Sequence, residues 1–414
     1  MTRRLFFYLA VAVCSAAAQQ LTFTPFDPSG IYDLGAKAGW RVTAAGVAGT
    51  PLKVEYVLRR NNADEVKRGL VDLTTGIGTI EASTTEPAMI YAEVTGAGDK
   101  PVHLGLAVAP SKLAPATPRP DDFDSFWDAK LKTLARIPIN PSLTPVPDMV
   151  EGVDLYTVKL DSVRSHVQGY LAKPSRDGKF PALVIYQYAG VYALNARTVT
   201  DRAAEGWLAF DVDSHDMLPT EATAPRNYQA VGNTDREASY FLNMYLRDAR
   251  AIDYIASRPD WDGKTIVIMG TSMGGQQSLV TAALRADLVT AVLVNEPSGA
   301  DSNGDLHGRK AGYPNWPSRD AAVMKTALYF DTVNFAPRIK APALVALGFI
   351  DTTAPPAGIW TAFNQISGPK ELIPMIESDH NNRTPEKQGA WNARSKEVLG
   401  ILLNGGTFVP QASK

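Results

Sequence analysis

The sequence contains a single cysteine, Cys14, among 414 residues. Cys14 lies in an N-terminal segment that we interpret as a removable leader, so we expect the mature chain to hold no thiol. A chain without thiols forms no disulfide and offers neither a cysteine nucleophile nor a cysteine metal ligand. The chemistry is therefore expected from hydroxyl, carboxylate and imidazole groups.

An excess of one charge and long apolar runs are also missing. Lys and Arg total 41 against 43 Asp and Glu, which gives a net charge of −2. The basic surface that nucleic acid phosphates require is absent, and no charge block indicates a membrane surface or a polyanion as partner. The apolar run 5–13 is shorter than the roughly 20 residues of a membrane-spanning helix. We expect no nucleic acid partner and no membrane span.

Residues 1–18 are typical of a secretory signal peptide. Arg3 and Arg4 precede the short apolar run, and small residues at 16–18 precede Gln19. This pattern predicts export to the periplasm or the medium. Two alternatives are an apolar first strand or helix and a lipid anchor at Cys14. The anchor is disfavoured because Val13 stands where a small residue is expected.

The length favours two or three domains, and 45% apolar with 20% charged residues is ordinary for a soluble protein with a substantial core. Short apolar runs at 54–58, 89–94 and 102–106 predict a small all-β, sandwich-like domain over residues 21–110. It shows no catalytic cluster, so we expect it to serve stability, assembly or polymer targeting. The proline-rich segment 111–120 is predicted to be a linker.

From residue 121 to about 405, strand-like runs alternate with helical ones. The predicted strands are 156–160, 167–172, 182–186, 207–211, 266–270, 291–294, 343–347 and 372–376. Their near-continuous apolar character predicts a mostly parallel sheet covered on both faces. The alternation predicts an α/β fold, and the motif described next predicts the α/β-hydrolase type.

The apolar strand 266–270 leads directly into Gly270-Thr-Ser272-Met-Gly274, and a helix-like run follows. In a strand–turn–helix context this pattern predicts a sharp turn that presents Ser272 as a nucleophile, with glycines where side chains would clash. The Met273 amide, at the start of the helix, is then a predicted oxyanion donor. The alternative is a glycine-rich turn in which Ser272 only caps the helix.

A serine nucleophile needs a base and an acid, which in this fold follow it in the order acid, then histidine. Asp351 follows the strand 343–347, and His380 follows the strand 372–376. We therefore predict a triad of Ser272, His380 and Asp351. The amide of Ala189, after the strand 182–186, is the predicted second oxyanion donor. No metal motif or phosphate-binding loop is present, so no cofactor and no metal are implied.

His215 is a competing base because it follows the strand 207–211 and lies between two aspartates. The chain order of the fold favours His380, since only His380 comes after the acid and after the last strand. We interpret His215 as a residue with a substrate-contact or structural role.

With these motifs, residues 115–405 resemble the acetyl xylan esterase and cephalosporin-C deacetylase family of carbohydrate esterases. The resemblance rests on four segments: 119–127, 270–275, 329–338 and 348–356. It implies the triad Ser272, Asp351 and His380. Four places depart from the family pattern: Met273 after the serine, Asn381 after the histidine, the segment 214–216, and Gln187-Tyr188-Ala189 in the oxyanion loop.

The resemblance implies a carboxylester hydrolase that deacetylates carbohydrates, with a small-molecule or oligosaccharide ester as substrate, and the signal pattern adds export. Aromatic residues at Tyr313 and Trp316 could line a sugar pocket, although such residues more often serve packing. The alternatives are another α/β-hydrolase, such as a peptidase or broad-specificity esterase, and a catalytically silent carbohydrate-binding protein. The sequence leaves the oligomeric state open.

Overall fold

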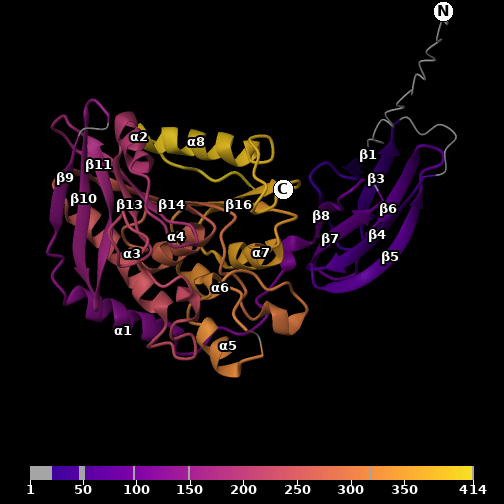
Figure 1. Cartoon of the computed structure of the whole chain (residues 1–414), viewed down its shortest axis with the longest axis horizontal. Helices are drawn as coiled ribbons and strands as arrows, with labels where there is room; N and C mark the ends of the chain where they lie inside the picture. The colour runs from indigo at the N-terminus through magenta and orange to yellow at the C-terminus, as the bar shows by residue number, and fades with distance from the viewer. Residues whose placement is uncertain (1–20, 46–51, 97, 148–149, 318, 413–414) are drawn as a thin grey trace, which may run out of the picture.

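A computed structural model describes residues 21–45, 52–96, 98–147, 150–317 and 319–412. The predicted signal peptide 1–18 and Cys14 lie outside these residues. Figure 1 shows a smaller all-β region, in indigo, beside a larger α/β region that runs from magenta to yellow. Among the described residues, no helix is long and apolar enough to cross a membrane.

The N-terminal region is built from two small sheets. Its strands are β1 (Leu21–Pro25), β2 (Ile31–Tyr32), β3 (Gly39–Ala44), β4 (Lys53–Arg60), β5 (Asp64–Asp72), β6 (Ile77–Glu81), β7 (Ala88–Thr95) and β8 (Val102–Val108). Three form a sheet in the order β1-β3-β6, and five form a sheet in the order β2-β8-β7-β4-β5. Trp40, Leu58 and Ile90 belong to one buried apolar cluster shared by both sheets. The sheets therefore pack as the sequence predicts.

The α/β region contains one sheet of nine strands, in the order β17-β16-β15-β14-β12-β13-β11-β10-β9. The strands are β9 (Ser142–Val146), β10 (Val153–Ser162), β11 (Ser165–Pro174), β12 (Phe180–Tyr186), β13 (Leu208–Val212), β14 (Trp261–Thr271), β15 (Ala291–Asn295), β16 (Ala343–Gly348) and β17 (Lys370–Met375). Strands β12 to β17 pair in parallel, and β9, β10 and β11 join in antiparallel fashion.

Helices cover both faces of this sheet. They are α1 (Phe123–Ala135), α2 (Arg197–Glu205), α3 (Tyr240–Ser257), α4 (Met273–Leu284), α5 (Ala321–Ala327), α6 (Thr332–Phe335), α7 (Pro356–Gln365) and α8 (Gly389–Leu403), with short 3₁₀ turns at Pro110–Lys112, Tyr228–Ala230, Gly304–His307 and Ala336–Arg338. Helices α2 and α8 lie on one face of the sheet and helices α1, α3, α4 and α7 on the other (Figure 1). Their buried side chains belong to two separate apolar clusters, one on each face. This is the predicted architecture.

Each strand predicted from residue 156 onward is present, with its ends shifted by a few residues. Strand β9 was not predicted. It lies at the edge of the sheet, is largely exposed and contains Pro145, so it carries neither an apolar run nor an uninterrupted set of donors.

The two regions meet beside the loop that follows β16. A Cβ added to Gly105 of β8 would lie 2.6 Å from the carbonyl oxygen of Phe349. A Cβ added to Gly30 would lie 3.3 Å from the ring of Phe349. Phe349 is buried, and it lies two residues before Asp351. The β region therefore packs directly against the segment that carries the predicted acid.

Candidate active site

Four neighbouring strands deliver the side chains of the site. Strands β14, β15, β16 and β17 lie side by side and run parallel, so their carboxyl ends share one edge of the sheet. Ser272 follows β14, Glu296 follows β15, Asp351 follows β16 and His380 follows β17. The sheet thus brings together residues that lie more than a hundred positions apart in the chain.

Ser272 occupies a strained turn between β14 and α4. Its φ is 57° and its ψ is −123°, values that few residues other than glycine adopt. A Cβ on Gly270 would lie 2.3 Å from the Gly274 backbone, and one on Gly274 would lie 2.2 Å from the Tyr186 carbonyl oxygen. Only glycine fits at these two positions. The Ser272 side chain makes no hydrogen bond to the first turn of α4, so it does not cap this helix.

The structure places the three predicted triad residues in hydrogen-bond contact. The Nε2 atom of His380 lies 2.8 Å from Oγ of Ser272, and its Nδ1 atom lies 2.7 Å from Oδ2 of Asp351. The other Asp351 oxygen accepts the amides of Thr353 and Ala354, each at 2.8 Å. Asp351 is buried, and these bonds fix its orientation. This geometry suits proton transfer from the Ser272 hydroxyl to the imidazole.

Glu296 is a site residue that the sequence analysis missed. Its side chain is fully buried, and its backbone has a φ of 47°. The carboxylate accepts hydrogen bonds from Ser378 (2.9 Å), Arg383 (2.8 Å) and Gln388 (3.2 Å). Burial raises the pKa of Glu296, and the nearby charge of Arg383 opposes that rise. The available signal was its position, directly after a predicted strand next to the nucleophile strand.

Glu296, Asp351 and His380 offer potential metal-ligand atoms within 4.8 Å of one another. Both nitrogens of His380 are used by Ser272 and Asp351, and the Glu296 carboxylate is bonded by Arg383. The donor set is therefore arranged for hydrogen bonding within the site.

The wall beside the nucleophile is built from tyrosines around Met273. The hydroxyls of Tyr228 and Tyr313 lie 2.7 Å apart and approach the Met273 sulfur at 3.4 and 3.1 Å. The Tyr228 hydroxyl also accepts the Gly190 amide at 3.3 Å. This contact connects the loop that carries Ala189 to Met273 at the start of α4. The segments of the two predicted oxyanion donors, the amides of Ala189 and Met273, are therefore joined.

His215 is buried at the back of the same loop. Its Nε2 lies 2.9 Å from the Gly190 carbonyl oxygen and its Nδ1 lies 2.8 Å from the Tyr240 hydroxyl. Burial lowers its pKa to about 4. With no exposed surface, His215 has a structural position, and the substrate-contact interpretation is wrong.

The two aromatic residues proposed to line a sugar pocket have different surroundings in the structure. Trp316 is buried, donates to the Gln229 carbonyl at 2.6 Å and packs edge-on against Phe241, so its role is packing. Tyr313 contacts Met273 as described above. A more exposed pair lies in the loop that carries Ala189, where Tyr188 stacks on Tyr192 with ring centroids 4.7 Å apart.

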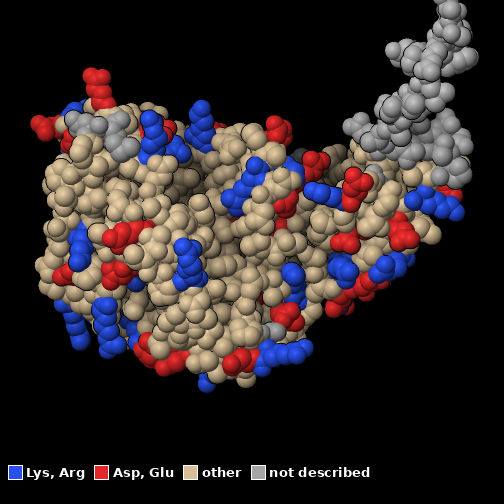
Figure 2. All heavy atoms as spheres, viewed as in Figure 1, with Lys and Arg blue, Asp and Glu red and all other residues tan. Residues whose placement is uncertain are grey.

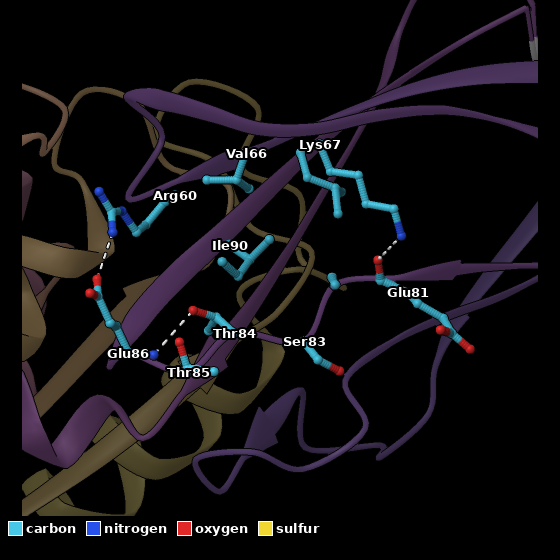
Figure 3. Close-up of a pocket in the computed structure, with 11 residues that line it drawn as sticks. Arg60, Val66, Lys67, Glu81, Ser83, Thr84, Thr85, Glu86 and Ile90 are labelled. Atoms are coloured by element: carbon cyan, nitrogen blue, oxygen red, sulfur yellow. Dashed lines mark hydrogen bonds and ion pairs between the residues drawn. The ribbon is translucent and has the colours of Figure 1, made fainter.

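Several hollows lie on or beside the β region. Figure 3 shows one of about 390 Å³, where Arg60 pairs with Glu86 and Lys67 donates to the Glu81 carbonyl; no histidine lines it. Another, of about 480 Å³, lies between β8 and the loop around His380, and Asp379 is among its lining residues. On the face shown in Figure 2, acidic and basic side chains are interspersed without a continuous patch of one sign.

Comparison with known proteins identifies the family. The family described as acetyl xylan esterase (AXE1) matches residues 111–298 and 312–393. Acetyl esterase Axe7A of Xylanibacter ruminicola is 31% identical over 384 residues, covering 87% of each chain. The β region, residues 21–110, and the segment 299–311 lie outside the family match.

Two solved structures share the fold. Acetyl xylan esterase from Paenibacillus sp. R4 has a TM-score of 0.62 at 23% identity, covering 72% of this chain and 98% of its own. Acetyl xylan esterase 1 from Thermoanaerobacterium sp. has a TM-score of 0.61 at 21% identity, covering 71% and 97%. With the family match and the close curated relative, these findings show that the chain belongs to the acetyl xylan esterase family of serine carboxylic ester hydrolases.

Proposed function

We propose that the protein is an exported acetyl esterase that removes acetyl groups from carbohydrates by way of an acyl-enzyme. The observation that carries this proposal is the continuous chain of hydrogen bonds from Ser272 through His380 to Asp351. Its placement on a strained strand–helix turn is what nucleophilic catalysis by serine requires. The acetyl and carbohydrate specificity rests on the family and its relatives.

In the proposed reaction, His380 takes the hydroxyl proton as the Ser272 oxygen attacks the ester carbonyl. The amides of Met273 and Ala189 stabilise the oxyanion, and Asp351 holds the imidazole in the required tautomer. The tetrahedral intermediate expels the sugar alkoxide, which takes the proton from His380. Water, deprotonated by the same imidazole, then attacks the acetyl-enzyme and releases acetate.

The test of substrate class is a panel of esters with one leaving group and increasing acyl length, together with acetylated xylo-oligosaccharides and peptides. We expect kcat/KM to fall from acetate to butyrate to octanoate, because a short pocket rejects added methylenes. Acetate release from the oligosaccharides is expected as well. A preference for octanoate, or cleavage of peptides alone, would contradict the proposed function.

Export is proposed from the signal pattern of residues 1–18 alone. The check is N-terminal sequencing of protein recovered outside the cytoplasm, which we expect to begin near Gln19. Recovery of the uncleaved chain from the cytoplasm would contradict it.

A further inference from the structure

We propose that Glu296 is a positioning residue that holds the loop of the catalytic base against the nucleophile strand. This inference rests on the proposed function, because it assumes that His380 acts as the base. Glu296 belongs to neither the predicted triad nor the oxyanion hole. It is delivered by β15, the strand between the one that carries Ser272 and the one that carries Asp351.

Within the described residues, the hydrogen-bond partners of the Glu296 carboxylate come from the segment that carries His380. Ser378 precedes the histidine by two residues, and Arg383 and Gln388 follow it. Arg383 contacts one carboxylate oxygen through two nitrogens, at 2.8 and 2.7 Å. Ser378 and Gln388 donate to the other oxygen and are joined to each other by a 2.7 Å hydrogen bond. One buried carboxylate therefore fastens the base loop on both sides of His380.

The backbone of Glu296 is also held in place by hydrogen bonds to the neighbouring strands. The Glu296 amide donates to the Ala346 carbonyl at 2.8 Å, and the Ser272 amide donates to the Asn295 carbonyl at 3.0 Å. These bonds extend the ladders of β15 with β16 and of β14 with β15 past the strand ends. Glu296 thus fixes the position of the loop that carries His380 relative to the turn that carries Ser272.

The buried Glu296 carboxylate, paired with Arg383, supports a role in placing His380 accurately. A buried carboxylate is costly unless it is paired and fully hydrogen-bonded, and here both oxygens are satisfied. A misplacement of about 1 Å between reacting groups can lower a rate by roughly 100-fold. A loop that carries the base gains more from such an anchor than an ordinary surface loop does.

The test compares Glu296→Ala with Glu371→Ala in the full chain. Glu371 is a matched control, since it is also buried in the sheet and pairs with an arginine, Arg394, through both oxygens. We expect Glu296→Ala to lower kcat by 10- to 100-fold with little change in KM. Glu371→Ala is expected to keep kcat within about twofold. Both should lose thermal stability, because each substitution removes a buried carboxylate and the hydrogen bonds that it accepts.

A spectroscopic measurement separates positioning from general stability. The proton in the 2.7 Å hydrogen bond between His380 and Asp351 should give a far-downfield resonance in the wild type and in Glu371→Ala. We expect this resonance to be broadened or lost in Glu296→Ala and to be retained in the conservative Glu296→Gln, with partial recovery of kcat.

Three results would overturn the inference: equal losses of kcat in both alanine variants, an unchanged resonance in Glu296→Ala, or a Glu296→Ala variant with wild-type kcat. If either alanine variant fails to fold, kcat is compared between Glu296→Gln and Glu371→Gln, and a kcat that falls no further in Glu296→Gln than in Glu371→Gln would overturn the inference. Failure of the proposed function is recognised separately, because then Ser272→Ala would retain the wild-type esterase activity.

Discussion

The two histidines near the edge of the sheet differ in their surroundings. His380 bridges Ser272 and Asp351, whereas His215 is enclosed between the Gly190 carbonyl and the Tyr240 hydroxyl. Burial disfavours the charged form of His215 and lowers its pKa to about 4. His215 is therefore neutral at physiological pH and is hydrogen-bonded to the loop that carries Ala189.

This state of His215 predicts a pH-dependent contribution to stability. The unfolded chain binds a proton at this residue near pH 6.5, and the folded chain does so only near pH 4. The unfolded state thus takes up more protons across this window, and the stability due to neutral His215 is lost as pH falls from 6.5 to 4. We expect about 2 kcal/mol of loss between pH 7 and pH 4.5.

The measurement is the unfolding free energy of wild type and His215→Gln at both pH values. The comparison is needed because burial raises the pKa values of Asp211 and Asp213 to about 7 and about 8, and these groups oppose the histidine. The stability difference between the two proteins should shrink at pH 4.5. A difference that is the same at both pH values would contradict a neutral buried His215.

At the scale of the elements, the sharp turn from β14 to α4 depends on the absence of side chains. An added Cβ at Gly274 would lie 2.2 Å from the Tyr186 carbonyl oxygen, so β12 and α4 would have to separate. We expect Gly274→Ala to cost about 2–3 kcal/mol of stability and to lower kcat. Denaturant unfolding and steady-state kinetics check this.

Gly400, inside α8, is the control for this substitution. A Cβ there meets nothing within 4 Å, and alanine is preferred to glycine inside a helix by about 0.5–1 kcal/mol. Gly400→Ala should therefore be neutral or stabilising with unchanged kcat. A stable, fully active Gly274→Ala would show that the turn is less tightly packed than described.

Much of this site could be predicted from sequence because strand order places its residues. Ser272, Asp351 and His380 each follow a recognisable apolar strand, and parallel strands end at one edge. Glu296 was missed because its partner Arg383 lies 87 positions away and no motif connects them. The burial of His215 was also hidden, since its neighbours in the chain are polar.

At the scale of the whole molecule, the β region lies closer to the chemistry than its sequence suggests. Strand β8 packs on Phe349, two residues before Asp351, and the Lys310 amide donates to the Asn61 carbonyl at 2.9 Å. Lys310 belongs to the segment that the family match leaves out. The sequence could not reveal these contacts because they join segments that lie far apart in the chain and share no motif.

This contact predicts that Gly105→Ala impairs catalysis from outside the α/β region. The added Cβ would lie 2.6 Å from the Phe349 carbonyl oxygen, and relief of the clash would shift the loop that ends at Asp351. We expect kcat/KM to fall by about 10- to 100-fold. Gly98→Ala, with nothing within 4 Å of the added Cβ, is the control and should behave as wild type. Equal activity of the two variants would mean that the β region has no influence on the acid.

Covalent labelling tests most directly whether the protein is a serine esterase with Ser272 as its nucleophile. A fluorophosphonate should modify the protein once, and peptide mass spectrometry should locate the adduct on Ser272. Ser272→Ala should keep the fold, as judged by circular dichroism, and lose both labelling and ester hydrolysis by several orders of magnitude. Persistent labelling or wild-type hydrolysis in a folded Ser272→Ala protein would contradict the account.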